Sequence, residues 1–243
     1  MKTEIFGVKF DNFTVEESVK KAVENLNTKR DFFIVTPNPE IVELARKNKE
    51  YRDVLNSADI VTPDGIGIVY ASKILKGHVK TRAPGFDIVC GIVEELSKIN
   101  GTVYLFGGKP GVADTAAKKL TEKYPGINIV GTHHGYFDND EEIVKDMALT
   151  SIEVAKQANI SMDEVASVGI ASPDLLLVCL GAPKQEFWIS RNIKSLNCGI
   201  LIGAGGSIDV LSGNVKRAPE VFIKLGLEWF YRLLKEPKRT FEN

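Results

Sequence analysis

The sequence lacks a long apolar run and is poor in cysteine, and each scarcity excludes a class of protein. Nowhere in the 243 residues do about 18 apolar residues stand together, so we expect no bilayer-spanning helix. The N-terminus has no apolar signal-peptide core. Cys90, Cys179 and Cys198 are too widely spaced for a metal site and stand in apolar surroundings, which predicts reduced core thiols. Together these features favour a cytoplasmic protein.

Familiar nucleotide and metal motifs are also absent from the sequence. No GxGxxG turn follows the first buried strand, which disfavours a Rossmann-type dehydrogenase. No Asp-x-Asp pair follows a strand, although that pair is the usual signature of a metal-dependent sugar transferase. His133 and His134 are adjacent and so point apart, with no third ligand nearby. We therefore expect no metal and no other cofactor, and the net charge of −1 gives no reason to expect nucleic acid.

Short apolar runs alternate with helical patterns along most of the chain. The apolar fraction of 44% and the charged fraction of 26% are those of an ordinary globular protein. Continuous apolar runs predict strands that are buried on both faces, and helices between them imply a parallel sheet. The predicted fold class is therefore α/β, with a Rossmann-like, mostly parallel sheet covered by helices. The predicted strands cover 5–10, 32–35, 58–61, 103–106, 127–132, 175–180 and 199–203. The predicted helices include 14–27, 39–56, 68–75, 84–99, 140–167 and 186–194, and one that ends near 123.

Two of the predicted strands run into Thr-Pro followed by a small polar residue, giving the segments 36–38 and 62–64. Proline ends each strand because it cannot donate to the ladder, so Asn38 and Asp64 stand at the carboxyl end of the sheet, where ligands bind in open α/β folds. Asp64 can act as a general base or can cap the next helix, and its position favours neither. Asn38 cannot usefully take up a proton, so it is suited to hydrogen-bonding a sugar.

Three glycine-containing loops also follow predicted strands. The segment 107–111 precedes a helix, where backbone N–H groups bind phosphate, but a plain tight turn explains it equally well. The segment 203–207 is as consistent with close backbone packing as with ligand contact. The segment 181–186 places Lys184 and Gln185 at the same edge, where they either begin a helix or bind a diphosphate or sugar hydroxyl.

The C-terminal segment is basic and amphipathic. We place a boundary near Gly213, which gives an α/β domain over 1–213 and an appendage over 214–243. A helix in the appendage would carry a row of apolar side chains from Val221 to Leu234. Such a helix suits an anionic membrane surface, and the alternative is that it packs on its own core or on a second subunit of a homo-oligomer. The basic residues of this segment are Lys216, Arg217, Lys224, Arg232, Lys235, Lys238 and Arg239.

Taken together, the motifs closely resemble those of the WecG/TagA/CpsF family of bacterial glycosyltransferases. The resemblance covers nearly the whole chain, from about residue 5 to 239, and its motifs are specific only in combination. One departure is the region from Tyr136 to the strand at Leu175, which is longer than we expect for the family. The segments that carry the resemblance are 36–38, 62–65, Arg82, 107–111, 181–186, 216–219, 226–229, 236–237 and Arg239.

The resemblance implies an inverting, metal-independent transfer at the inner face of the cell membrane. The implied donor is UDP-N-acetylmannosamine, and the acceptor is N-acetylglucosamine on undecaprenyl diphosphate, as in the linkage unit of wall teichoic acid. Relatives also use glucose or N-acetylmannosaminuronate donors, so another UDP-sugar is an alternative. A nucleotide-sugar-binding module without catalysis is the remaining alternative.

The resemblance also assigns roles to individual residues. Asp64 resembles the catalytic base, Thr36 and Asn38 resemble pocket residues near the sugar, and Arg82 and Gln185 resemble further active-site residues. Without a metal, arginine or lysine must stabilise the diphosphate leaving group. The predicted substrate-binding residues are Gly107, Gly108, Lys109, Gly135, Tyr136, Lys184, Arg217, Arg232 and Arg239.

Overall fold

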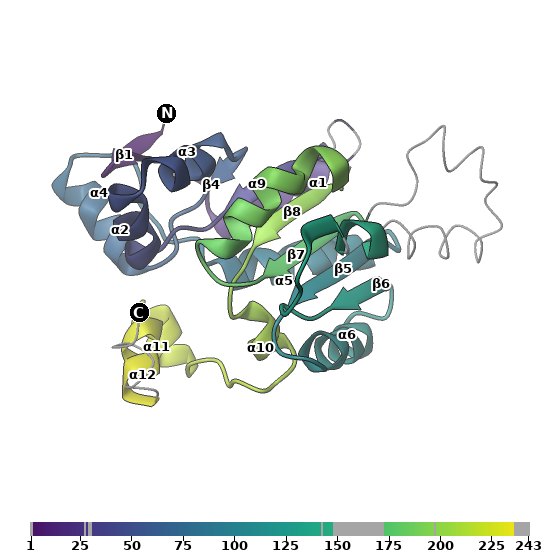
Figure 1. Cartoon of the computed structure of the whole chain (residues 1–243). Helices are drawn as coiled ribbons and strands as arrows, with labels where there is room; N and C mark the ends of the chain where they lie inside the picture. Colours follow the sequence, from purple (N-terminus) through teal and green to yellow (C-terminus); the bar gives the residue numbers. More distant parts are fainter. Residues whose placement is uncertain are drawn as a thin grey trace.

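The chain folds into a six-stranded sheet between two layers of helices, with a small two-stranded sheet beside it (Figure 1). A computed structural model describes residues 2–26, 28, 31–141, 143–147, 173–196 and 198–235. The strands are β1 (Thr3–Ile5), β2 (Val8–Phe10), β3 (Phe32–Val35), β4 (Ile60–Val61), β5 (Thr102–Gly107), β6 (Asn128–His133), β7 (Leu175–Cys179) and β8 (Ile200–Gly203). The first six helices are α1 (Val15–Asn25), α2 (Pro39–Lys47), α3 (Lys49–Ser57), α4 (Ile66–Ile74), α5 (Gly85–Ser97) and α6 (Val112–Lys123). The later helices are α9 (Lys184–Leu196), α10 (Ser207–Leu211), α11 (Glu220–Lys224) and α12 (Glu228–Lys235).

The large sheet has the strand order β4-β3-β8-β7-β5-β6, and all of its pairings are parallel. The predicted α/β class with a mostly parallel sheet is therefore confirmed. Because the strands are parallel, all six carboxyl ends lie at one edge of the sheet. The loops that carry the predicted site residues after β3, β4, β5, β6, β7 and β8 thus meet at that edge.

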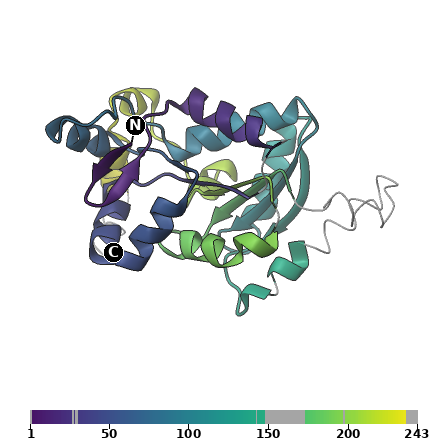
Figure 2. The ribbon, with the colours of Figure 1, turned by 90° about the horizontal axis from the view of Figure 1, so that it is seen from above.

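Alternate residues of each buried strand enter two separate cores, one on each face of the sheet. On one face Phe33, Val35 and Leu201 pack with side chains of α2, α3 and α9. On the other face Ile34 and Ile202 pack with side chains of α1, α5 and α6. Figure 2 shows this layering, with α1 and α5 on one side of the sheet and α9 on the other. Burial on both faces explains why the strands read as continuous apolar runs.

Local signals set the start of two helices near the N-terminus. The Oγ1 of Thr14 accepts from the backbone N–H of Glu17 and the Glu17 carboxylate accepts from the Thr14 N–H, which is the predicted capping box. The Asn38 side chain accepts from the N–H of Ile41 at 2.9 Å, with Pro39 at the first position of α2.

Several predicted elements are divided or shortened in the structure. The strand expected over 5–10 is a hairpin, because Phe6 and Gly7 take positive φ and turn the chain. The helix expected over 39–56 is interrupted at Asn48, whose extended backbone ends α2 and whose side chain accepts from the Tyr51 N–H to begin α3. The single C-terminal helix is instead α11 and α12, separated around Gly226 at φ +71°. The strand expected over 58–61 is shortened to β4 (Ile60–Val61). Most of the helix expected over 140–167 lies outside the described residues.

Candidate functional site

The two Thr-Pro turns lie side by side at the carboxyl edge of the sheet. β3 and β4 are neighbours, with Val35 in register with Val61. The ladder continues past the strands, because the Thr62 N–H donates to the Val35 carbonyl at 2.9 Å. The Asp64 N–H then donates to the Pro37 carbonyl at 3.2 Å. Pairing of β3 with β4 therefore brings both turns to one part of the edge.

The Asp64 carboxylate lies at the N-terminus of α5. Its Oδ2 accepts from the N–H of Gly85, the first residue of that helix, at 3.2 Å. Asp64 does not cap the helix that follows it, because the N-cap of α4 is Gly65 and no side chain bonds there. A helix N-terminus favours negative charge, so this position stabilises the ionised carboxylate that a general base requires.

Thr36 packs against the same helix start. A Cβ atom placed on Gly85 would lie 2.6 Å from the Thr36 Oγ1, so no larger residue fits without displacement. Thr36 is buried, whereas Asp64 is half-buried and remains accessible to a ligand. Glycine at position 85 therefore lets the Thr36 hydroxyl and the Asp64 carboxylate converge.

Asn38 has a structural role as well as its predicted contact with a sugar. Its Oδ1 accepts from the backbone of α2, as the N-cap of that helix. The carbonyl end of the amide is thus committed to the protein, and a sugar hydroxyl would meet the amide nitrogen. Asn38 is half-buried at the edge next to Asp64.

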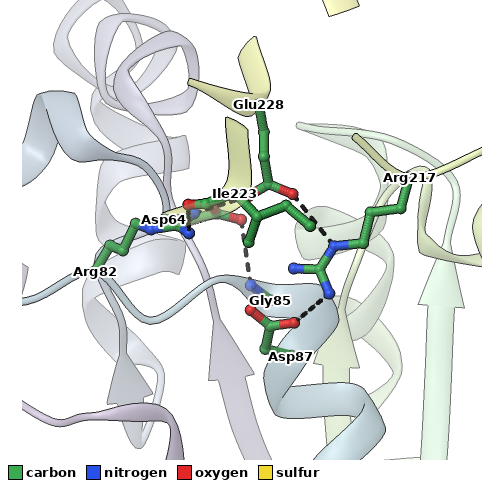
Figure 3. A network of polar contacts seen from close by, with 7 residues as sticks. All are labelled: Asp64, Arg82, Gly85, Asp87, Arg217, Ile223 and Glu228. Atoms are coloured by element: carbon green, nitrogen blue, oxygen red, sulfur yellow. Dashed lines mark hydrogen bonds and ion pairs between the residues drawn. The ribbon is translucent and has the colours of Figure 1, made fainter. Parts of the chain in front are cut away.

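The C-terminal segment reaches this region through a network of ion pairs, shown in Figure 3. Arg82 donates to the Glu228 carboxylate at 2.8 Å and to the backbone carbonyl of Ile223. Arg217 lies 2.6 Å from the Asp87 carboxylate and 3.3 Å from the other Glu228 oxygen. Glu228 therefore bridges two arginines that the sequence analysis assigned to the site.

Arg217 is further fixed by the start of α5. Its guanidinium lies 4.7 Å from the centre of the Phe86 ring, a cation–π contact. Desolvation opposes its charge, but the carboxylates of Asp87 and Glu228 outweigh it and raise the pKa of Arg217. Both Arg82 and Arg217 are less than a third exposed and are held in place by these contacts within the protein.

Gln185 joins two of the glycine loops. Its Oε1 accepts from the N–H of Gly181 at 3.2 Å and from the N–H of Gly205 at 2.9 Å. Its Nε2 donates to the buried Glu186 carboxylate at 2.7 Å, and the Tyr51 hydroxyl donates to the other Glu186 oxygen at 3.0 Å. Gln185 is thus buried and bound to the protein at both ends of its amide.

Desolvation raises the pKa of Glu186, and the hydrogen bonds from Gln185 and Tyr51 offset this only in part. Desolvation, followed by the nearby Glu186 charge, also raises the pKa of the Tyr51 hydroxyl. This network holds the loops after β7 and β8 together, directly below the carboxyl edge.

The other predicted glycines form the far part of the edge. A Cβ on Gly107 would lie 2.2 Å from the Cys179 carbonyl oxygen, so β5 and β7 approach too closely there for any side chain. The Gly135 N–H donates to the Gly108 carbonyl at 2.8 Å, which joins the loops after β5 and β6. Close packing therefore explains Gly107, while Gly111 at the N-cap of α6 has open space around it.

The predicted substrate-binding residues lie at two separate places along the edge. Arg217 lies near the start of α5, and the residues after β5, β6 and β7 lie farther along the sheet. Lys109, Tyr136 and Lys184 are exposed near the ends of β5, β6 and β7, and the Lys184 ammonium lies 4.5 Å from the centre of the Phe137 ring. β4, which precedes Asp64, and β5, which precedes Lys109, are four strand spacings apart, or about 19 Å. The exposed side chains in this part of the edge therefore cannot contact the same substrate atom as Asp64. Arg239 and the side chain of Arg232 lie outside the described part of the chain.

The sequence analysis did not identify Gly85, Asp87, Glu186 and Glu228 as parts of the site. Gly85 directly follows a proline at a helix start, which is a weak signal for a crowded position. Glu228 stands in a segment that carries the family resemblance, but its partners lie far away along the chain. No local pattern could have identified those contacts.

Within the described ranges, no group of three or more His, Cys, Asp and Glu residues lies together as a metal site would require. No helix among the same residues is long and apolar enough to cross a membrane.

Comparison with known proteins identifies the family of the chain. The model of the "Glycosyl transferase WecG/TagA/CpsF family" matches residues 3–243. A Bacillus spizizenii protein named N-acetylglucosaminyldiphosphoundecaprenol N-acetyl-beta-D-mannosaminyltransferase is 36% identical over 214 residues, covering 88% of this chain and 75% of the relative. A Staphylococcus aureus protein of the same name, from strain MW2, is 34% identical over 241 residues, covering 98% of this chain and 86% of the relative. The chain therefore belongs to the WecG/TagA/CpsF family of glycosyl transferases.

Proposed function

We propose that the protein transfers N-acetylmannosamine from UDP-N-acetylmannosamine to N-acetylglucosamine carried on undecaprenyl diphosphate. The relatives with this acceptor and this sugar in their names align with 88% and 98% of the chain. The observation that carries the proposal is the position of Asp64. Its carboxylate is half-buried, lies beside Thr36 and stands at a helix N-terminus on the ligand-binding edge of the sheet.

The proposed reaction is a single displacement with inversion at the sugar. The 4-hydroxyl oxygen of the acceptor attacks C1 of the donor sugar, and the bond between C1 and the diphosphate oxygen breaks. Asp64 takes the proton of the attacking hydroxyl, and UDP leaves with the bonding electron pair. Thr36 and Asn38 flank Asp64 and are suited to orient sugar hydroxyls by hydrogen bonds.

Arg82 and Arg217 are proposed to stabilise the negative charge that develops on the leaving diphosphate. Guanidinium groups bind phosphate oxygens bidentately and remain charged at any physiological pH. Both arginines lie within reach of one carboxylate, Glu228, so they are close enough to bind one anionic group together. The loop 107–111, with Lys109 and Lys184, then offers contacts for the more distant part of the nucleotide.

We propose that the chain divides into a catalytic part over 1–213 and an appendage over 214–243 that has a surface role. Val221, Leu225, Trp229 and Leu234 are exposed on α11 and α12. Exposed apolar side chains beside basic residues are typical of segments that lie in a bilayer interface. We propose that the appendage holds the enzyme at the inner membrane surface, where the lipid-linked acceptor is found.

The proposed base is tested with Asp64→Asn. Asparagine keeps an oxygen that can accept from Gly85, so the free energy of unfolding should change by less than about 1 kcal/mol. It cannot take up the hydroxyl proton, so sugar transfer should fall by about 10²- to 10⁴-fold. The measurement is the release of UDP with a lipid-diphosphate acceptor, together with a urea melt.

Asp53→Asn is the matched control, because Asp53 is an exposed carboxylate on α3 that pairs with Lys49. Its transfer rate should equal that of the unchanged protein. Full activity of Asp64→Asn would contradict the base assignment. A panel of UDP-N-acetylmannosamine, UDP-glucose and UDP-N-acetylmannosaminuronate identifies the donor, and turnover with none of them would leave only a binding module.

A further inference from the structure

The C-terminal end of α4 carries an exposed apolar cluster that the proposed chemistry does not use. The exposed apolar residues are Tyr70, Ile74 and Leu75, with Ile74 the most exposed of them at 80%. Lys73 and Lys76 are exposed between and beside them. We call these five residues the α4 tip.

The sequence around the α4 tip carries charge of one sign. The sequence from Gly65 to Phe86 contains no Asp or Glu, and it continues past the α4 tip to the exposed Lys80. The strand β1 packs against this region with Thr3, whose Oγ1 accepts from the His78 N–H at 2.7 Å. Glu4 of the same strand is exposed on its opposite side, so it does not neutralise the cluster.

The α4 tip also lies at the same end of the molecule as the appendage. A Cβ on Gly226, between α11 and α12, would lie 2.9 Å from the Cβ of Ile66, so the appendage packs on the first residue of α4. Figures 1 and 2 both show α4, α11 and α12 at the end of the molecule away from β6. The exposed side chains of α4 thus extend the apolar and basic surface of the appendage.

We propose that the α4 tip is a second membrane contact, which inserts Tyr70, Ile74 and Leu75 into the interface of an anionic bilayer. Apolar burial and attraction between lysine and anionic headgroups add at such a surface. Contacts at both the appendage and the α4 tip would restrict the rotation of the molecule on the bilayer more than a single contact does. The choice of a membrane as partner rests on the proposed transfer to a lipid-linked acceptor.

A second copy of the chain fits this surface less well. A symmetric contact through this surface would bring Lys73 and Lys76 of both copies into one interface, and the sequence from Gly65 to Phe86 has no Asp or Glu to pair with them. The three apolar side chains of the α4 tip alone offer less than the roughly 800 Å² per partner that a stable protein interface buries. The headgroups of an anionic bilayer pair with the lysine charges, and insertion of a few side chains does not require so large a buried area.

The experiment measures binding of the full chain to vesicles without any substrate. The unchanged protein should bind vesicles that contain phosphatidylglycerol more tightly than vesicles of phosphatidylcholine alone. Ile74→Glu should weaken binding to the anionic vesicles by about tenfold, because it removes one buried apolar side chain and adds a repelled charge. The matched control is Ile99→Glu, which changes an exposed isoleucine after α5, near the opposite edge of the sheet.

Equal binding of Ile74→Glu and the unchanged protein would overturn the proposal, as would no binding of the unchanged protein to anionic vesicles. Light scattering at the same protein concentration tests whether a second copy of the chain binds the α4 tip. A dimer that Ile74→Glu dissociates would also overturn the membrane proposal. Transfer to a short-chain, water-soluble acceptor is measured in parallel. Ile74→Glu should retain that activity. If the unchanged protein shows no transfer to the water-soluble acceptor, that result would count against the proposed function and not against the membrane contact.

Discussion

The Gln185 side chain makes hydrogen bonds to the protein at both ends of its amide. Its oxygen holds the loops after β7 and β8, and its nitrogen is held by Glu186. A side chain in this arrangement positions the backbone at the edge of the sheet more readily than it contacts a substrate. The sequence analysis placed Gln185 among the catalytic residues, and the structure supports a role in shaping that edge.

Burial of Glu186 leads to a prediction about pH. Its pKa in the folded protein is raised above the usual 4.5, mainly by desolvation, so the folded state holds a proton that the unfolded chain has lost. The stabilisation from this proton is therefore complete below about pH 4.5 and is lost as the pH rises through the folded pKa. Glu186→Gln does not titrate, so its free energy of unfolding should increase relative to that of the unchanged protein across this window. The increase should be about 1.4 kcal/mol for each pH unit that separates the folded pKa from the unfolded pKa.

Urea melts from pH 4.5 to 8 check this difference. Glu24→Gln is the control, because Glu24 is an exposed carboxylate on α1 that pairs with Lys20, and its melts should run parallel to those of the unchanged protein. Parallel curves for Glu186→Gln as well would show that folding does not raise the pKa of Glu186.

At the scale of elements, sequence patterns predicted the sheet well and the helix boundaries poorly. The strands near 32–35, 175–180 and 199–203 were predicted because burial on both faces leaves a continuous apolar run. The break at Asn48 was missed, since the apolar stripe continues across it while the Asn48 side chain caps α3. The break near Gly226 depends on a positive φ that no periodicity reveals.

The sequence predicted the site residues at the ends of the strands but not the contacts that complete the site. Thr36, Asn38 and Asp64 were placed at strand ends, and pairing of β3 with β4 brings them together. The contacts that complete the site join residues far apart in sequence, such as Asp64 to Gly85 and Arg82 to Glu228. Long-range contacts leave no periodic trace in one sequence, so they required the structure.

The connection between α11 and α12 gives a prediction for an element. Gly226→Ala places a Cβ 2.9 Å from Ile66, closer than ordinary contact, and puts a side chain in the left-handed region. Amide hydrogen exchange over 220–235 should therefore become faster, while exchange in β3, β7 and β8 should stay the same. Gly206→Ala is the control, because φ is −73° there and no atom lies within 4 Å of the added Cβ. Unchanged exchange over 220–235 would show that the appendage does not depend on this contact with α4.

At the scale of the whole molecule, ion pairs hold the segment 217–228 against the sheet edge. Residues 146 positions apart meet where Arg82 contacts Glu228, and Arg217 joins them to Asp87 at the start of α5. The two arginines thus stabilise the docked appendage while their positive charge is balanced by carboxylates. A diphosphate that binds both arginines must compete with Glu228.

This competition predicts the effect of Glu228→Gln on binding of UDP. Glutamine removes one negative charge, while Arg82 keeps its contact with Ile223 and Arg217 keeps Asp87 and Phe86, so the appendage stays attached. The two partly exposed ion pairs are worth about 0.2–1 kcal/mol each, so the Kd for UDP should fall by about two- to thirtyfold at low salt.

Isothermal titration at about 50 and 500 mM NaCl measures this change, and the gain should shrink at high salt because screening weakens the attraction. Glu220→Gln is the matched control, since Glu220 is an exposed carboxylate of the same appendage that pairs with Lys224 at 3.6 Å. An increase in Kd for Glu228→Gln would mean that Glu228 positions the arginines for the diphosphate and does not compete with it. The sign of this one change therefore distinguishes a carboxylate that the substrate displaces from one that it requires.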